Sequence, residues 1–294
     1  MPETAARIAP ETTVGAVALT VADLERSLAF YREALGLRPL AGAPGRATLG
    51  ADGRPLVELV EVPGARPAPG ATGLFHFALL VPGRADLARW LAHAARERLP
   101  LHGLSDHFVS EAIYLADPDG HGIEVYADRP RERWQGRVER MTTLPLDVQD
   151  LLGELDDPGT EPFEGLPAGT RMGHVHLQVA SVPEAVRFYR DVLGFDLMTT
   201  YGSQAAFLSA GGYHHHVGVN TWSSEGGSPP PPGAAALRHA TIVLPDREER
   251  DRVAARVVAA GGEPAEREDG LLVHDPSGIP LLLAVPDGGT DGAK

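Results

Sequence analysis

Residues 21–37 read VADLERSLAFYREALGL, and residues 179–195 read VASVPEAVRFYRDVLGF, so one pattern returns 158 residues later. The turn Asp117-Pro-Asp-Gly120 returns as Asp275-Pro-Ser-Gly278 with the same shift. A repeat that covers most of each half indicates that one structural unit has been duplicated. The sequence therefore predicts two copies of the same unit.

Each copy is expected to begin with a strand and a helix. Apolar residues alternate over 17–21, as in a half-buried strand, and then follow helical spacing over 24–35 until Gly36. The second copy has the same two patterns over 175–179 and 182–193. A glycine directly after a helical pattern is typical of a helix end.

A second strand and helix follow within each copy, with strand starts at 74–80 and 237–244. The fold class predicted is α+β, with four modules of one strand, one helix and three further strands (βαβββ). We expect two tandem domains, residues 12–130 and 171–287, each of two modules.

The predicted connections between these units have the composition of linkers. Residues 131–170 form the connection between the domains, and from about residue 141 onwards they are acidic and rich in turn formers. Residues 228–233 contain four prolines and are expected to link the last two modules.

Composition favours a small-molecule partner. The chain has 294 residues, a net charge of −14 and no cysteine, which argues against binding to nucleic acid or to an anionic membrane and excludes thiolate ligands. No stretch approaches the ~20 apolar residues that span a bilayer, and no basic segment precedes an apolar run, so a cytoplasmic protein is expected. The sequence leaves open whether copies form a homo-oligomer.

Two motifs carry a family resemblance. Val-x-Asp-Leu-x-x-Ser-x-x-Phe-Tyr-x-x-x-Leu-Gly over 21–36 and Asp-Pro-Asp-Gly-x-x-Ile-Glu over 117–124 resemble the vicinal oxygen chelate superfamily. Glyoxalase I, bleomycin-resistance proteins and extradiol ring-cleavage dioxygenases share this pattern, and the count of four modules is similar to two-domain catechol-2,3-dioxygenase-like proteins. The resemblance implies that paired modules form open sheet cups with a metal on the concave face.

The resemblance places one ligand near the start of each module's first strand and another on its last strand. Modules two and three then offer His76, Glu124 and His174, whereas module four offers His239 opposite Leu282, so His239 is expected to be a relic or a core histidine. Two imidazoles and one carboxylate come together only if module two faces module three. We predict this cross-half pairing, although familiar extradiol enzymes pair modules within each half.

Such a triad suits Fe(II), with Mn(II) as the alternative, and leaves three coordination positions for a diol and O2. The resemblance implies that His107 and Tyr114 donate hydrogen bonds to substrate oxygens and that His215 is the acid/base. His216 is the rival of His215, because strand alternation over 214–220 would allow it to point into the cup as a fourth ligand of glyoxalase type. His176 is a candidate substrate contact.

Structural interpretations compete with these assignments. A single histidine on a strand is usually part of the packing, Tyr114 could equally be an ordinary core residue, and His214 is expected to have no role. Phe30, Tyr31, Phe188 and Tyr189 are read as packing on the core faces of the helices.

Three functions remain open from the sequence. The leading one is metal-dependent extradiol cleavage of a catechol-like aromatic diol with O2. The second is a glyoxalase-like, metal-dependent isomerase or lyase. The third is a non-enzymatic protein that binds a small molecule, as resistance proteins do.

Overall fold

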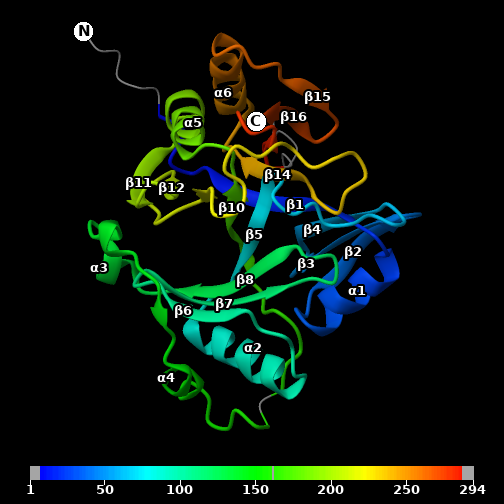
Figure 1. Ribbon diagram of the computed structural model, residues 1–294. Coiled ribbons are helices and arrows are strands. Elements are labelled where there is room, and N and C mark those ends of the chain that lie inside the picture. Colours follow the sequence, from blue (N-terminus) through cyan, green and yellow to red (C-terminus); the bar gives the residue numbers. More distant parts are fainter. Residues whose placement is uncertain (1–6, 161, 287–294) are drawn as a thin grey trace, which may run out of the picture.

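The computed structural model describes residues 7–160 and 162–286, and its strands form two large sheets (Figure 1). In spatial order, the first sheet consists of β15 (Ala265–Arg267), β16 (Gly270–His274), β17 (Pro280–Ala284), β14 (Leu237–Val243), β1 (Thr13–Val21), β4 (Arg54–Glu61), β3 (Arg46–Ala51) and β2 (Arg38–Ala43). The second sheet consists of β11 (Asp196–Tyr201), β12 (Ala205–Ser209), β13 (Val217–Asn220), β10 (Arg171–Gln178), β5 (Gly73–Leu80), β8 (Gly122–Asp128), β7 (Ser110–Ala116), β6 (Gly103–Asp106) and β9 (Leu144–Pro145).

Each sheet joins one module from each half of the chain. The strand β10 pairs with β5 in antiparallel fashion, and β1 pairs with β14 in the same way. The second sheet is therefore built from modules two and three, and the first sheet from modules one and four. The cross-half pairing expected from the complementary ligand positions is confirmed, while the residue boundaries given above for the two domains stay a prediction.

The two copies of the repeated motif form the same local structure. The helix α1 (Leu24–Glu33) is capped by Asp23, whose side chain accepts from the backbone N–H of Arg26 at 3.0 Å. In the second copy, α5 (Val182–Val186) continues into the π-helical segment η2 (Arg187–Leu193) and ends at Gly194 with φ +95°. Because a left-handed residue closes the helix at little cost only when it is glycine, this position explains the repeated Leu-Gly.

The remaining helices lie on the outside of the sheets or between the halves. They are α2 (Arg84–Arg96), α3 (Arg131–Trp134), the 3₁₀ turn η1 (Val138–Arg140), α4 (Val148–Leu152) and α6 (Arg247–Ala259). Figure 1 shows α2 and α4 at one end of the molecule and α5 and α6 at the other. Within the described residues, no helix is both long and apolar enough to cross a membrane.

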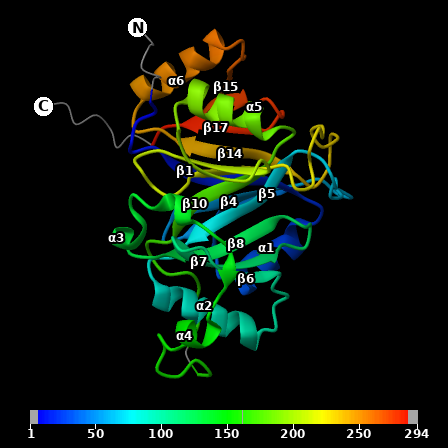
Figure 2. The same cartoon turned by 60° about the vertical axis from the view of Figure 1, so that its left-hand side comes forward.

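The core lies between the two sheets, where β1 and β10 meet (Figure 2). Val17, Leu19, Val175 and Leu177 belong to one buried cluster. Because side chains alternate along a strand, the intervening residues of β10, which include His174, face the opposite side, the concave face of the second sheet. The apolar alternation in the sequence therefore also decides which residues face the cup.

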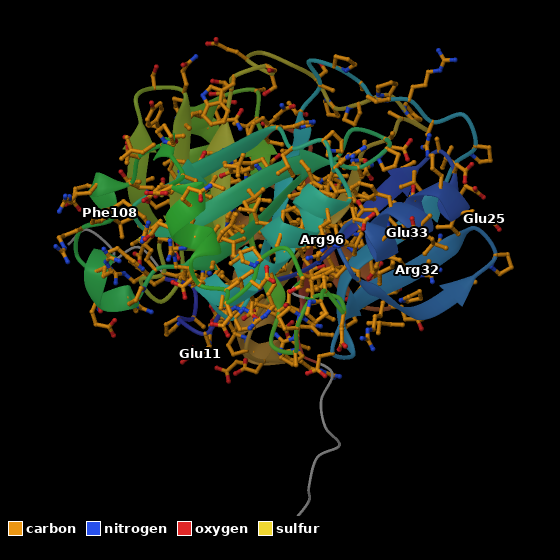
Figure 3. The ribbon with its side chains drawn as sticks, turned by 90° about the horizontal axis from the view of Figure 1, so that it is seen from below. Glu11, Glu25, Arg32, Glu33, Arg96 and Phe108 are labelled. Atoms are coloured by element: carbon orange, nitrogen blue, oxygen red, sulfur yellow. The ribbon has the colours of Figure 1, made fainter. Side chains whose placement is uncertain are left out.

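Helix α1 is amphipathic in the way that this arrangement requires. Glu25, Arg32 and Glu33 are exposed, and Figure 3 shows them in the right half of the molecule seen from below, with Glu25 at its margin. Tyr31 is fully buried, and its hydroxyl donates to Asp117 at 3.0 Å. This contact ties the helix of module one to the Asp-Pro turn of module two.

Candidate metal centre

Three buried side chains of the second sheet converge on its concave face. His76 lies on β5, Glu124 on β8 and His174 on β10, and these strands are direct neighbours in the order β10, β5, β8. Nε2 of His76 lies 3.0 Å from Oε2 of Glu124, and Nε2 of His174 lies 3.2 Å from the same oxygen. The two imidazole nitrogens are 3.4 Å apart. The three residues predicted as ligands are thus brought together.

These spacings fit three neighbouring positions of an octahedral metal. Ligand atoms about 2.1 Å from a metal and at right angles to one another lie about 3 Å apart. Among the described residues, His76, Glu124 and His174 form the group of ligand types that could hold a metal ion. Two histidines and one carboxylate on one face of an octahedron leave the opposite face open for other molecules.

The electrostatics of the triad favour the protonation states that ligate. Burial by itself would raise the pKa of Glu124, but His174 and His76 hold that pKa well below its usual value, so the carboxylate is ionised. Burial lowers the pKa of His174, with Glu124 partly opposing the shift. Carboxylate and neutral imidazole are the forms that bind a divalent cation.

The ring of Tyr126 packs against the imidazole of His174. The two rings are 5.0 Å apart, and the Tyr126 hydroxyl lies over Gly173, where any side chain would collide with it. The same hydroxyl is 2.8 Å from that of Tyr213. Gly173 is therefore required for close packing beside the triad.

His107 and Tyr114 form a pair at the cavity. Nε2 of His107 lies 2.7 Å from the Tyr114 hydroxyl, and its Nδ1 lies 2.7 Å from the carbonyl oxygen of Thr142. Tyr114 is opposite Glu124 in the ladder of β7 and β8. Burial and the nearby Glu124 charge raise the pKa of Tyr114 well above its usual value, so its hydroxyl keeps its proton.

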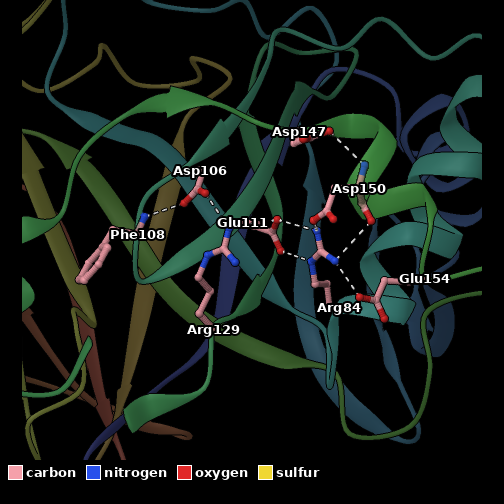
Figure 4. A network of polar contacts seen from close by, with 8 residues as sticks. All are labelled: Arg84, Asp106, Phe108, Glu111, Arg129, Asp147, Asp150 and Glu154. Carbon is pink, nitrogen blue, oxygen red and sulfur yellow. Dashed lines mark hydrogen bonds and ion pairs between the residues drawn. The ribbon is translucent and has the colours of Figure 1, made fainter. Parts of the chain in front are cut away.

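The loop that carries His107 is fixed by the polar network shown in Figure 4. Phe108 has φ +70°, a strained value for an aromatic residue, and its N–H donates to Asp106 at 2.8 Å. Arg129 binds the same carboxylate at 2.6 Å and also reaches buried Glu111 at 3.2 Å. Arg84 binds Glu111 from the other side at 2.6 Å. The hairpin of β6 and β7 is thus held by Arg129 on one side of Glu111 and by Arg84 on the other.

His215 lines the cavity and is linked to a chain of polar groups behind it. Its Nδ1 lies 2.7 Å from Nδ1 of His214, and Nε2 of His214 lies 2.9 Å from Oδ1 of Asp128. The Tyr213 hydroxyl donates to the same Asp128 oxygen at 3.0 Å. His214, for which the sequence indicated no role, therefore connects the candidate acid/base to a carboxylate.

His216 does not point into the cavity. Its Nδ1 accepts a hydrogen bond from the N–H of Ala210 at 3.2 Å and lies 3.0 Å from the Ser209 hydroxyl. The strand alternation expected over residues 214–220 is wrong for its first part, because β13 begins only at Val217 and the histidines lie in the preceding loop. His216 thus supplies no fourth ligand to the triad, and burial lowers its pKa to about 3.

The triad opens into a cavity of about 820 Å³. His107, Tyr114, His176 and His215 line it together with the three candidate ligands. His176 is buried, and its Nε2 has no hydrogen-bond partner among the described residues.

The sequence reasoning missed two groups of residues around this cavity. Asp128 follows Glu124 by four positions on the same strand, so strand alternation could have placed it on the same face. The proline-rich segment read as a linker contributes Pro230 to the wall, and Trp222 and Phe75 also line the cavity. No motif in the sequence marks these three residues.

A family model described as the glyoxalase/bleomycin resistance protein/dioxygenase superfamily matches residues 13–125 and 171–281. The chain belongs to this superfamily. Its members are the proteins expected from the two motifs, and the duplicated match agrees with the repeat. Superfamily membership implies a divalent metal, in agreement with the triad.

Relatives of known sequence or structure support this placement within the superfamily. The chain is 45% identical over 270 residues to a protein of Bacillus subtilis (strain 168) named catechol-2,3-dioxygenase, covering 90% of this chain and 94% of the relative. A crystal structure of a putative dioxygenase from Bacillus subtilis matches 97% of this chain and 87% of its own, with a TM-score of 0.68 and 16% identity. Glyoxalase I from Zea mays matches 94% of this chain and 92% of its own, with a TM-score of 0.58 and 17% identity. The last two likenesses concern the fold.

Proposed function

We propose that the protein is a metal-dependent extradiol dioxygenase that cleaves the ring of a catechol-like diol with O2. The observation that carries this proposal is the triad of His76, Glu124 and His174, whose atoms are spaced as one octahedral face and open into a cavity. The name of the Bacillus subtilis relative, catechol-2,3-dioxygenase, supports the same activity. Fe(II) is the metal we propose, with Mn(II) as the alternative, since both suit this ligand set.

His76, Glu124 and His174 would hold the metal, which would supply Lewis acidity that favours a deprotonated diol and electrons for the activation of O2. The overall reaction breaks one ring carbon–carbon bond next to a hydroxyl and places both oxygen atoms of O2 in the product. The product is a ring-opened acid that carries an aldehyde or ketone, and no other oxidant or reductant is consumed.

His215 is the residue that we propose removes a diol proton. Burial and the neighbouring histidines lower its pKa well below the usual value, so the ring is neutral and able to accept. The contacts of its Nδ1 also select a tautomer. With a neutral His214 whose Nε2–H donates to Asp128, the Nδ1 of His214 must accept, so the Nδ1 of His215 donates. The Nε2 of His215 then carries a free lone pair for the cavity.

His107 and Tyr114 are proposed to orient the substrate oxygens. The Tyr114 hydroxyl keeps its proton and lies on the strand next to Glu124, so it can turn that proton from Nε2 of His107 to a substrate oxygen near the triad. His107 is held by the Thr142 carbonyl, which fixes the ring for its 2.7 Å contact with Tyr114. The Tyr114 hydroxyl, positioned by His107, stabilises negative charge on a substrate oxygen better than water does, because it is preorganised.

The test is to load the protein with Fe(II) without oxygen, add a catechol and then admit air. We expect uptake of one O2 per diol and a yellow ring-fission product. A matched Glu124→Gln protein, which keeps the size of the side chain but loses its charge, should show neither. No oxygen uptake across a panel of diols by the metal-loaded wild type would contradict the proposal.

A further inference from the structure

The cavity is much larger than one benzene ring requires. Pockets of roughly 300 to 1,000 Å³ hold ligands of drug size, and the cavity of about 820 Å³ lies in the upper part of this range. The triad occupies only one part of its wall. The remaining space must be filled by a substituent on the diol or by water.

An aromatic wall begins directly beside the triad. The rings of His76 and His176 are 5.0 Å apart, and those of Phe75 and His176 are 5.3 Å apart. Trp222 continues this wall at 5.2 Å from Phe75 and 5.4 Å from His176. Aromatic rings at these distances form a surface on which an apolar or aromatic group packs favourably.

The sequence around His176 keeps this wall close to the sheet. His176 is opposite Gly218 in the ladder of β10 and β13, and a Cβ at Gly218 would lie 2.9 Å from the imidazole. Only glycine leaves room for the ring in this position. The backbone at Trp222 is held in place, because its main-chain N–H donates to the side-chain oxygen of Asn220 at 3.1 Å.

Two loops extend the apolar wall toward solvent. Residues 62–72 and 221–236 lie side by side (Figures 1 and 2), with Thr72 N–H donating to Ser228 O at 3.0 Å and Ala235 N–H donating to Arg66 O at 2.9 Å. They line the cavity with small apolar residues, Pro67, Ala68, Pro69, Pro230 and Ala235. Trp222 is 44% exposed although it is a large apolar side chain, so part of its ring is open to a ligand in the cavity.

The cavity, as far as the chain is described, offers no cationic side chain that could pair with an anionic substituent. Among the described residues that line it, none is lysine or arginine, and the two acids are Glu124 and Asp119. Asp119 is already bound to Arg26 at 2.6 Å. The net charge of −14 would repel an anionic substrate as well.

On the basis of the proposed function, we infer that the substrate is a catechol that carries an uncharged alkyl or aryl substituent, which packs against Phe75, His176 and Trp222. His176 adds one polar contact to this wall. Its Nε2 is buried without a partner among the described residues, so it is available to a hydroxyl or ether oxygen near the ring. Trp222 is a specificity-determining residue, because it contacts the substituent and not the diol.

The experiment compares three diols: catechol, a phenyl-substituted catechol and a dihydroxybenzoate, which carries a carboxylate. Binding is measured by anaerobic calorimetry on the metal-loaded protein, and kcat/KM is measured in air. We expect the phenyl compound to bind and react at least about tenfold better than catechol, and the carboxylate to be the poorest. Trp222→Ala should lower the ratio of phenyl compound to catechol about tenfold. Val258→Ala, which removes an exposed apolar side chain of α6 outside the cavity, should leave the ratio unchanged.

Two results would overturn the inference: a preference for catechol or for the carboxylate, or an unchanged ratio in Trp222→Ala. A failure of the proposed function looks different. In that case the phenyl compound would still bind more tightly than catechol without oxygen, but no diol would be cleaved when air is admitted.

Discussion

The two sheets of this protein share one architecture, but only one of them collects metal-ligating side chains. In the second sheet, His76 is opposite His176 in the ladder of β5 and β10. In the first sheet, His239 is opposite Ala18 in the corresponding ladder of β14 and β1. The fold thus creates the same strand junction twice.

The side chains at equivalent positions differ. A shift of 158 residues relates Ala16 to His174 and Leu282 to Glu124, so of the three positions in the first sheet that correspond to the triad, only that of His239 has a ligand type. Burial lowers the pKa of His239, and it has no carboxylate where the second sheet has Glu124. The fold therefore supplies the same strand junction in both sheets, while three side chains decide whether that junction can hold a metal.

The largest expected difference between the sheets is in metal content. His174→Ala should lose the bound metal and lower kcat/KM by roughly a thousandfold or more, because a two-ligand site cannot hold the ion in place. The matched variant His239→Ala should keep both metal and activity. Elemental analysis of anaerobically loaded proteins and an oxygen electrode measure the two effects. Metal loss in His239→Ala would remove the distinction between the sheets.

The second expected effect concerns the chain of contacts behind His215, which has no counterpart among the described residues of the first sheet. An amide at Asp128 can donate to Nε2 of His214, which reverses both tautomers and leaves a proton on Nε2 of His215. Asp128→Asn should therefore lower kcat about a hundredfold with metal content unchanged. Tyr213→Phe, which removes only the other hydrogen bond to Asp128, should have a much smaller effect. Equal effects of the two variants would argue for general destabilisation.

The third effect belongs to the first sheet and concerns stability. Burial raises the pKa of Asp275 to about 6, although it accepts from backbone N–H groups and the Tyr189 hydroxyl. Because the folded protein binds this proton more tightly than the unfolded chain, the stabilisation is complete below about pH 4 and is lost as the pH rises through about 6. The free energy of unfolding should fall by about 3 kcal/mol over this range from this group. Denaturant unfolding of Asp275→Asn should lack this component, and an identical pH profile would contradict it.

The smallest expected effect is at Tyr114. Tyr114→Phe removes a hydroxyl that donates toward the substrate, and kcat/KM should fall about tenfold, as for one lost hydrogen bond to a charged group. Tyr31→Phe is the matched control, because the Tyr31 hydroxyl binds Asp117 and lies outside the cavity. Steady-state kinetics with unchanged metal content test this, and a Tyr114→Phe protein with full activity would exclude the role.

Much of this arrangement could be predicted from the sequence. The alternation of apolar residues in β1 and β10 fixed which residues face the cup, and the complementary ligands of the two copies indicated that modules two and three pair. His76, Glu124 and His174 followed from these two patterns and the family motifs. These patterns identify the residues of one face because strand periodicity directly constrains the direction of each side chain.

The remaining parts depend on tertiary contacts that no local pattern records. Asp128 and His214 are 86 residues apart, and only the sheet register brings them within 2.9 Å. His216 was placed by strand alternation in a segment that is a loop, where no such rule holds. The segment 131–170, predicted to be a connection, adds β9 to the second sheet and holds His107 through Thr142. A cytoplasmic location and a homo-oligomer stay predictions.

The most direct test of the metal centre is a crystal structure of the protein loaded with Mn(II) without oxygen, with the ion located by its anomalous scattering. We expect one strong peak within about 2.0 to 2.2 Å of Nε2 of His76, Nε2 of His174 and an oxygen of Glu124. A peak elsewhere, or these three side chains bonded to one another with no ion between them, would contradict it.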